Sequence, residues 1–267
     1  MSTSILDADA LRRALSISDL TDPQNGPHAL SLMVELLASS LAQSTGARLV
    51  LRRATPIVSI ADNYDRLRYP PDGAARDARY SRYVCETALL RTHTSAMIPP
   101  LLMEVARASD NHLLLACPGL VYRRDSIDRN HVGEPHQIDL WRIRKGSRLG
   151  PLDLVAMIDE VAQVALPGWR HRVTPAVHPY TEHGLQIDVE APNGWLEIGE
   201  CGVAHPAVLA DSGLDPAAWS GLAMGVGLDR LVMLRKGIDD IRLLRSRDRR
   251  IASQMGDLSP YRPVSSM

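Results

Sequence analysis

Apolar and polar positions alternate along the chain in patterns that separate helices from strands. Residues 28–43 carry leucines and a methionine every three or four positions, which predicts an amphipathic helix. A turn-rich stretch at 22–27 precedes it, and Gly46 is a typical residue to end it. The segment 48–52 that follows has an apolar centre between two arginines and predicts a strand that runs to Pro56.

The rest of the chain shows the same two patterns. Further helices are predicted at 94–108, 151–165 and the second half of 221–235, and strands at 112–123, 135–144, 172–178, 184–190 and 194–199. This order predicts an α+β fold with a mainly antiparallel sheet flanked by helices, in one domain over residues 1–267 with an N-terminal arm at 1–27. It differs from the βαβ alternation of dinucleotide-binding folds, and neither GxGxxG nor GxxxxGK[ST] occurs.

Composition narrows the class of protein. The 267 residues are 45% hydrophobic and 23% charged, which is typical of a soluble globular protein. The 30 basic and 31 acidic residues give a net charge of -1, which excludes a generally cationic nucleic-acid-binding surface but allows a local basic patch. The apolar runs are too short to span a bilayer, and the first sixteen residues resemble neither a signal nor a transit peptide. Three widely spaced cysteines suit neither a zinc site nor a disulfide framework, so we expect a reduced, cytoplasmic enzyme.

The first segment with candidate chemistry is Arg91-Thr92-His93-Thr94-Ser95, just before the predicted helix at 94–108. The free N–H groups of a helix N-terminus can hold a carboxylate or phosphate. The alternative is that Thr94 or Ser95 merely caps the helix, and this segment alone favours that structural role.

The second segment is the predicted hairpin at 117–143, with a polar connection. Side chains alternate along strands, so Arg123 and Asp125 share one face, and Gln137 and Asp139 share a face on the return strand. One side of the hairpin can therefore gather an arginine, two aspartates and a glutamine. A solvated hairpin with charged pairs explains the same pattern equally well.

The third segment, residues 221–244, is a glycine-lined strand that leads into a helix with Arg230 near its start. Glycines let a ligand lie close to the backbone, and an arginine at this junction can reach a phosphate. The alternative is close packing of strand and helix with an arginine at the surface.

Together, the three segments resemble the catalytic core of class II aminoacyl-tRNA synthetases, specifically the phenylalanyl-tRNA synthetase alpha subunit, over about residues 19–250. LVYRRDSIDRNHVGEPHQID resembles motif 2 of that family and GVGLDRLVMLRKGIDDIR resembles motif 3. The helix and strand up to Pro56 resemble motif 1, and RTHTS resembles the family's substrate-binding segment. The resemblance implies an antiparallel class II sheet and ATP-dependent activation of an amino acid to an aminoacyl-adenylate, with ATP and Mg²⁺.

The resemblance also implies roles for the nucleotide-binding residues. Arg123 would hold the α-phosphate, Arg230 the γ-phosphate, and His131 would contact phosphates from the motif 2 loop. Asp125 stands where the family carries a Glu at the adenine end. Glu197 resembles the acidic Mg²⁺ ligand, with Asp188 as a weaker candidate.

The amino-acid site implied by the resemblance contains four residues that would hold the ammonium and carboxylate groups: His93, Ser95, Gln137 and Asp139. Ala223 is a further substrate-binding candidate. The family's Phe-Pro-Phe segment corresponds here to His178-Pro179-Tyr180, so an apolar aromatic floor gains polar groups. Those groups would be left unpaired against a phenyl ring, at a cost of about 1–3 kcal/mol for each buried group. We therefore expect a substrate other than, or broader than, phenylalanine, such as a hydroxylated or heteroaromatic amino acid.

The acceptor of the activated amino acid stays open. Nothing in the sequence resembles the family's coiled-coil arm, its beta subunit or an anticodon-binding domain. The acceptor end of tRNA, a carrier protein and another amine or metabolite are the candidates. A non-catalytic regulatory paralogue would be expected to lack the phosphate-binding arginines, which are present. Motif 1 implies a homodimer with the helix at 28–43 and the strand near 47–55 at the contact.

Overall fold

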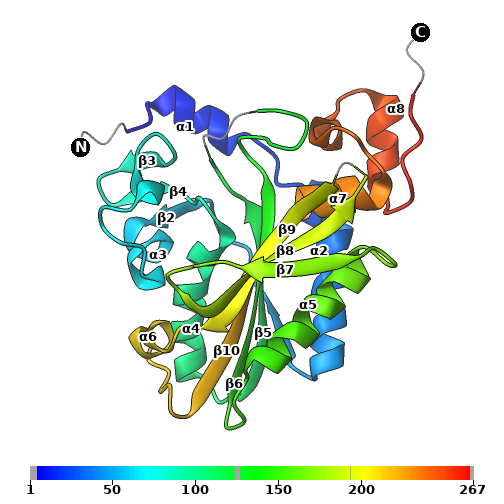
Figure 1. Ribbon diagram of the computed structural model, residues 1–267. Coiled ribbons are helices and arrows are strands. Elements are labelled where there is room, and N and C mark those ends of the chain that lie inside the picture. The colour runs from blue at the N-terminus through cyan, green and yellow to red at the C-terminus, as the bar shows by residue number, and fades with distance from the viewer. Residues whose placement is uncertain (1–4, 124–126, 193, 265–267) are drawn as a thin grey trace.

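The computed structural model describes residues 5–123, 127–192 and 194–264 (Figure 1). Within these residues, seven strands form one large sheet, in the spatial order β1 (Arg48–Leu51), β5 (His112–Leu120), β6 (His136–Lys145), β10 (Trp219–Gly227), β9 (Gly194–Ala204), β8 (Thr181–Ala191) and β7 (His171–Pro175). Neighbouring strands are antiparallel except for β1 and β5, which run parallel. This arrangement confirms the predicted α+β fold with a mainly antiparallel sheet.

The helices of the described chain are α1 (Ala8–Leu15), α2 (Ala29–Thr45), α3 (Ile60–Asn63), α4 (Ile98–Arg107), α5 (Pro151–Ala165), α6 (Pro206–Asp211), α7 (Leu228–Lys236) and α8 (Arg249–Ala252). The predicted helices at 28–43 and 151–165 are confirmed as α2 and α5. Gly46 ends α2 in the left-handed conformation (φ 64°), which glycine adopts without strain. None of the described helices is long and apolar enough to cross a membrane.

The two faces of the large sheet are covered differently. Helices α2, α5 and α7 pack along one face, against residues such as Ile138, Leu140 and Met224, and α2 and α5 lie side by side (Figure 1). On the other face, α4 and α6 pack only over one end, where Trp141 and Ala223 are buried. The opposite end of that second face is left open by the helices.

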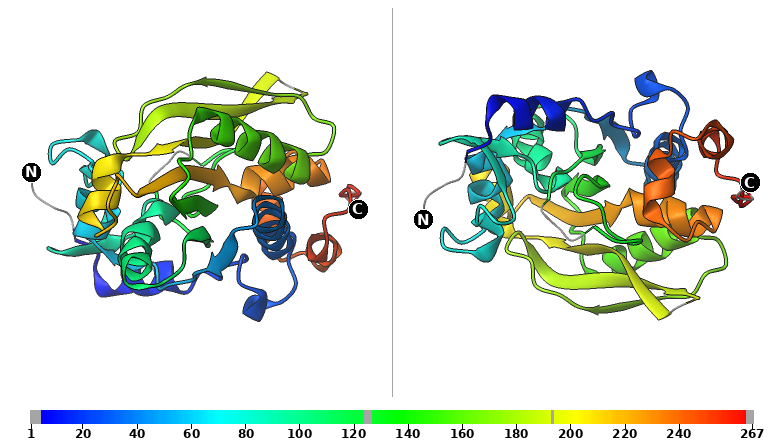
Figure 2. Two further views of the ribbon diagram at one scale, coloured as in Figure 1. Left: turned by 90° about the horizontal axis from the view of Figure 1, so that it is seen from below. Right: turned by 90° about the horizontal axis from the view of Figure 1, so that it is seen from above.

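Three short strands were not predicted. They form a second sheet in the order β2 (Ile57–Ser59), β4 (Ala88–Leu90) and β3 (Arg82–Cys85). Helix α1 and helix α8 lie at opposite ends of the molecule in both views of Figure 2.

Two expectations for the segments before the site need correction. The helix expected at 94–108 begins as a 3-10 turn over Thr94–Met97, and α4 starts only at Ile98. Pro99 and Pro100 lack backbone N–H groups, so they fit the first turn of an α-helix, where those donors have no partner. Strand β5 ends at Leu120 rather than at 123, although the Arg123 N–H still donates to the Gly133 carbonyl (2.8 Å) and prolongs the hairpin.

Candidate functional site

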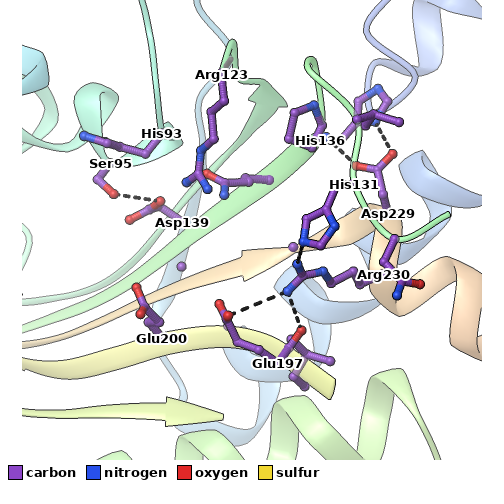
Figure 3. A pocket seen from close by; sticks show the side chains of 18 of the residues that line it. His93, Ser95, Arg123, His131, His136, Asp139, Glu197, Glu200, Asp229 and Arg230 are labelled. Atoms are coloured by element: carbon purple, nitrogen blue, oxygen red, sulfur yellow. Dashed lines mark hydrogen bonds and ion pairs between the residues drawn. The ribbon is translucent and has the colours of Figure 1, made fainter. Parts of the chain in front are cut away.

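A cavity of about 440 Å³ occupies the open end of the second sheet face (Figure 3). Strands β6, β9 and β10 form its floor, and the 3-10 turn, the β5–β6 connection and the start of α7 form its walls. The predicted site residues that line it are His93, Ser95, Arg123, His131, Gln137, Asp139, Tyr180, Glu197 and Arg230. Segments far apart in the sequence thus meet at one cavity.

The floor is organised by strand register. Gly225 of β10 lies opposite Asp139 of β6 on one side and opposite Glu200 of β9 on the other. Residues opposite each other in a sheet share a face, so two carboxylates flank a position without a side chain. Gly227 lies opposite Gln137 in the next row that faces the cavity. The predicted role of the glycines, to give a ligand close access to the backbone, fits this open floor.

Arg230 marks one end of the cavity. It lies in the first turn of α7, where its guanidinium donates to the Glu197 carbonyl (2.8 Å) and lies 3.7 Å from the Glu197 carboxylate. Its other terminal nitrogen is 3.1 Å from Nε2 of His131, whose Nδ1 in turn lies 2.9 Å from Asp128. Burial raises the pKa of Glu197, while the nearby arginines oppose this increase. An arginine, a histidine and a partly exposed carboxylate at one end can bind a polyphosphate with its metal.

Arg123 reaches into the middle of the cavity (Figure 3). Its Nε–H donates to the Thr92 carbonyl (3.0 Å), and its own backbone carbonyl accepts from Arg82 (2.8 Å). The first bond orients the guanidinium of Arg123, and the second holds its backbone. Its predicted strand neighbour Asp125 lies outside the described residues.

Asp139 is a buried carboxylate at the other end of the cavity. It accepts hydrogen bonds from the Thr94 hydroxyl (2.8 Å), the Ser95 hydroxyl (3.1 Å) and the Trp141 indole (3.1 Å). Burial raises the pKa of Asp139 to about 6, and the three hydrogen bonds only partly oppose this effect. Neither hydroxyl caps the helix, because both point at Asp139. Such a carboxylate favours a cationic ligand.

Aromatic rings form the wall beside Asp139. The Tyr69 ring stacks on His93 with centroids 5.4 Å apart, and the Tyr180 ring lies between Tyr69 (6.2 Å) and Trp141 (6.1 Å). Both ring nitrogens of His93 are buried, and this desolvation lowers the pKa of His93 to about 3, so its ring is neutral. Within the described residues, neither ring nitrogen of His93 has a hydrogen-bond partner. A ligand in the cavity can satisfy them.

The structure places three predicted residues outside the cavity lining. His178 lies behind the wall, with its Nε2 2.8 Å from the Glu200 carboxylate. Asp188 is buried, where it accepts from Arg172 (3.1 Å) and Gln186 (2.7 Å). Ala223 shares the cavity's face one row beyond Gly225, opposite Trp141, but is buried in the apolar cluster beneath α4.

The structure brings to the site several residues for which the sequence predicted no role. Glu200 and Tyr69 line the cavity. So do His136 and Asp229, which form a buried pair: the His136 Nδ1–H donates to Asp229 at 2.9 Å, and its Nε2 accepts from Arg245 (3.0 Å) and from the Leu20 N–H (3.1 Å). This pair joins the start of β6, the start of α7 and both terminal segments. His136 and Asp229 lie within the segments that resemble motifs 2 and 3, so the sequence could have indicated both residues through those motifs.

The acidic residues of the cavity suit Mg²⁺ only together with a nucleotide. Among the described residues, no group of three or more histidines, cysteines or acidic residues is arranged to hold a metal ion. Mg²⁺ in nucleotide sites usually takes one or two carboxylates and completes its shell with phosphate oxygens and water. Glu197, which is partly exposed and next to Arg230, meets that smaller requirement.

The chain belongs to the class II tRNA synthetase core family, because residues 37–255 match the family model "tRNA synthetases class II core domain (F)". Among its relatives are the phenylalanine–tRNA ligase alpha subunits of Chlorobium phaeobacteroides and Prochlorococcus marinus. Each is 37% identical to this chain, over 210 and 192 residues respectively. Each alignment covers 72% of this chain, but only 60% and 56% of the respective relative.

Solved structures support the same fold. A pyrrolysyl-tRNA synthetase of Desulfitobacterium hafniense superposes with a TM-score of 0.60, over 82% of this chain and 73% of that one. At 19% sequence identity, this likeness concerns the fold alone. The fold expected from the three segments is therefore confirmed by family and by structure.

Proposed function

We propose that the protein activates an amino acid with ATP, forming an aminoacyl-adenylate and pyrophosphate. A carboxylate oxygen of the amino acid attacks the α-phosphorus, a new P–O bond forms, and the bond to the pyrophosphate oxygen breaks. Charge spread over phosphoryl oxygens must be positioned and neutralised, which needs fixed cations rather than covalent catalysis. The observation that carries the proposal is that Arg123 and Arg230 line the same cavity as the ammonium-type site at Asp139.

The proposed roles follow the order of groups along the cavity. Arg123, in the middle, lies where an α-phosphate next to the amino acid would be, and Arg230 with His131 lies where the terminal phosphates would be. Asp139 would bind the ammonium group of the amino acid, with Ser95, Gln137 and His93 beside it. Asp125, outside the described residues, stays the proposed contact at the adenine end.

Mg²⁺, if bound as in related nucleotide sites, would neutralise the pyrophosphate and would be held chiefly by Glu197. Its partly exposed carboxylate faces the same end of the cavity as Arg230. Asp188 stays a weaker candidate, since its carboxylate already accepts from two side chains.

The acceptor proposed for the adenylate is the terminal adenosine of a tRNA, because the family and the named relatives are tRNA ligases. A carrier protein or another amine is the alternative to be tested with the purified adenylate. A purely regulatory paralogue is disfavoured by the presence of both arginines at one cavity. The three cysteines are free thiols, which fits the proposed reducing, cytoplasmic location.

A homodimer is proposed through α2 and β1. Strand β1 is an edge strand of the large sheet, and the outer side of α2 borders a surface groove of about 560 Å³ with Leu32, Leu36 and Leu258 among its lining. Sedimentation velocity of wild type and Leu36→Glu tests this proposal. A dimer that the substitution dissociates supports it, and a wild-type monomer contradicts it.

Amino-acid-dependent ATP–pyrophosphate exchange tests the activation step. We expect exchange with at least one amino acid, and a loss of about 10²–10³-fold in Arg123→Ala, which is the range for removal of a fixed charge-stabilising donor. Arg12→Ala is the matched control, because Arg12 is exposed and pairs only with Asp9 in the described structure. Exchange that survives equally in both variants would refute the role of Arg123.

A further inference from the structure

Glu200 lies across the cavity floor from Asp139. The two residues occupy one transverse row of the sheet, with Gly225 between them. Because neighbouring strands are about 4.8 Å apart, their backbones are about 10 Å apart. The floor between them carries no side chain, so a bound amino acid can lie over Gly225 with one end at each carboxylate.

A bulge gives Glu200 this orientation. On a regular strand, residues three apart face opposite sides, but the pairing of β8 with β9 shifts register between Ile187 and Asp188. Glu197 and Glu200 consequently both line the cavity. Figure 3 shows Glu197 on the side of Arg230 and Glu200 on the side of Asp139. The two glutamates therefore serve different ends of the site.

Glu200 is also held in place. His178 lies 2.8 Å from its carboxylate and is itself nearly buried, with a side chain only 10% exposed. The hydrogen bond from His178 lowers the pKa of Glu200, with Arg123 contributing, so Glu200 is a carboxylate at neutral pH. The other Glu200 oxygen can still accept a hydrogen bond from the cavity.

Aromatic rings that carry polar groups surround Glu200. Tyr69, Tyr180 and His93 line the same end of the cavity. Glu200 is close enough to raise the pKa of both tyrosines further, beyond the larger effect of their burial. Aromatic faces next to a carboxylate favour N–H and O–H donors and cations. A hydrocarbon side chain would instead desolvate Glu200 and leave the ring nitrogens of His93 without a hydrogen-bond partner.

We propose that Glu200, positioned by His178, selects an amino acid whose side chain ends in an N–H or O–H donor over one with a hydrocarbon side chain. This inference rests on the proposed amino-acid activation and names its substrate class. Glu200 would contact the side chain of the bound amino acid, while Asp139 would bind its ammonium group. The competing role for Glu200 is that of a second Mg²⁺ ligand beside Glu197.

Two measurements on wild type and Glu200→Gln separate these roles. Calorimetric binding without ATP uses tyrosine, histidine, tryptophan and lysine as donor-bearing probes and phenylalanine and leucine as hydrocarbon probes. Pyrophosphate exchange with the same amino acids is measured over a range of Mg²⁺ concentrations. Glu182→Gln is the matched control, since Glu182 is an exposed glutamate of the neighbouring strand β8.

We expect wild type to bind at least one donor-bearing probe more tightly than phenylalanine and leucine. Glu200→Gln should weaken that binding about 10- to 100-fold, the range for a hydrogen bond to a charged group, while hydrocarbon probes and the Glu182→Gln control change less than twofold. Preferred binding of phenylalanine or leucine would overturn the inference. So would an equal loss for all amino acids that extra Mg²⁺ restores, which would make Glu200 a metal ligand.

The two proposals fail in different ways. Selective binding of a donor-bearing amino acid without any exchange in wild type would overturn the proposed activation and leave the role of Glu200 supported. Exchange that is strongest with phenylalanine and unchanged in Glu200→Gln would support activation and overturn the selection by Glu200.

Discussion

Replacement of Asp139 by asparagine should stabilise the protein without a ligand and weaken its binding of the amino acid. Its pKa of about 6, against an ordinary value of 3.8, corresponds to about 3 kcal/mol of unfavourable free energy for the ionised form in the folded protein. Asparagine has nearly the same shape, and the Thr94 and Ser95 hydroxyls can rotate to accept from its amide. We therefore expect Asp139→Asn to raise the free energy of unfolding at pH 8 by about 1–3 kcal/mol.

The sign of the pH dependence follows from the raised pKa. Well below pH 3.8, Asp139 is protonated in the folded and the unfolded chain, so wild type and Asp139→Asn should differ little. As the pH rises from about 4 to 6, the unfolded chain releases this proton first, and wild type loses stability relative to the variant. Well above pH 6, where Asp139 is ionised in the folded and the unfolded chain, the difference should be constant.

Urea denaturation at pH 4, 6 and 8 measures this difference, and calorimetry measures amino-acid affinity at pH 8. We expect affinity to fall about 100-fold, because the ammonium group loses its charged partner. Asp139→Ala is the comparison, and it should destabilise the protein, since three donors lose their acceptor. An Asp139→Asn variant that is less stable than wild type by the same amount at every pH would refute the reasoning.

Two further predictions concern residues around the cavity. Asp229→Asn should lower the free energy of unfolding by about 2–4 kcal/mol at pH 7, because it breaks a buried pair with His136, and urea midpoints that do not move would contradict this. Burial raises the pKa of Asp229, but the contacts with His136 and Arg245 outweigh this effect and lower it below 3.8. The stability lost in Asp229→Asn should therefore shrink only as the pH falls below about 3.8. His131→Ala should raise the KM for ATP about tenfold in the exchange assay with the amino-acid KM unchanged, because His131 contacts Arg230, and a change confined to the amino-acid KM would contradict it.

The fold was predictable where local chemistry marks the ends of elements. Gly46 and Pro151 lie at a helix end and a helix start, and the two helices that they bound lie where the periodicity places them. The small sheet β2–β4–β3 was missed, because its strands are three or four residues long and separated by loops. The start of α4 was misplaced because the sequence pattern does not distinguish a 3-10 turn from the first turn of an α-helix.

The site was predictable only as far as sequence motifs reach. Arg123, Asp139 and Arg230 belong to the segments that resemble known motifs, and the structure gathers them at one cavity. Glu200 escaped because its orientation depends on a bulge in the β8–β9 pairing, and a regular strand would turn it away from Glu197. Tyr69 was not predicted because it lies in a loop, and the alternation of side chains along strands does not determine the path of a loop.

The cavity keeps several buried polar groups without full compensation. His93 has no hydrogen-bond partner in the described structure, and Asp139 carries a charge that burial disfavours. An ammonium group would pair with the charge of Asp139, and a polar side chain would give His93 a hydrogen-bond partner. Binding should therefore be selective for ligands that carry both groups. The opposite sheet face, where α2, α5 and α7 cover a continuous apolar cluster, supplies the stability that lets these groups persist. Substitutions in that cluster should therefore change stability before specificity, whereas a substitution at Glu200 should change specificity first.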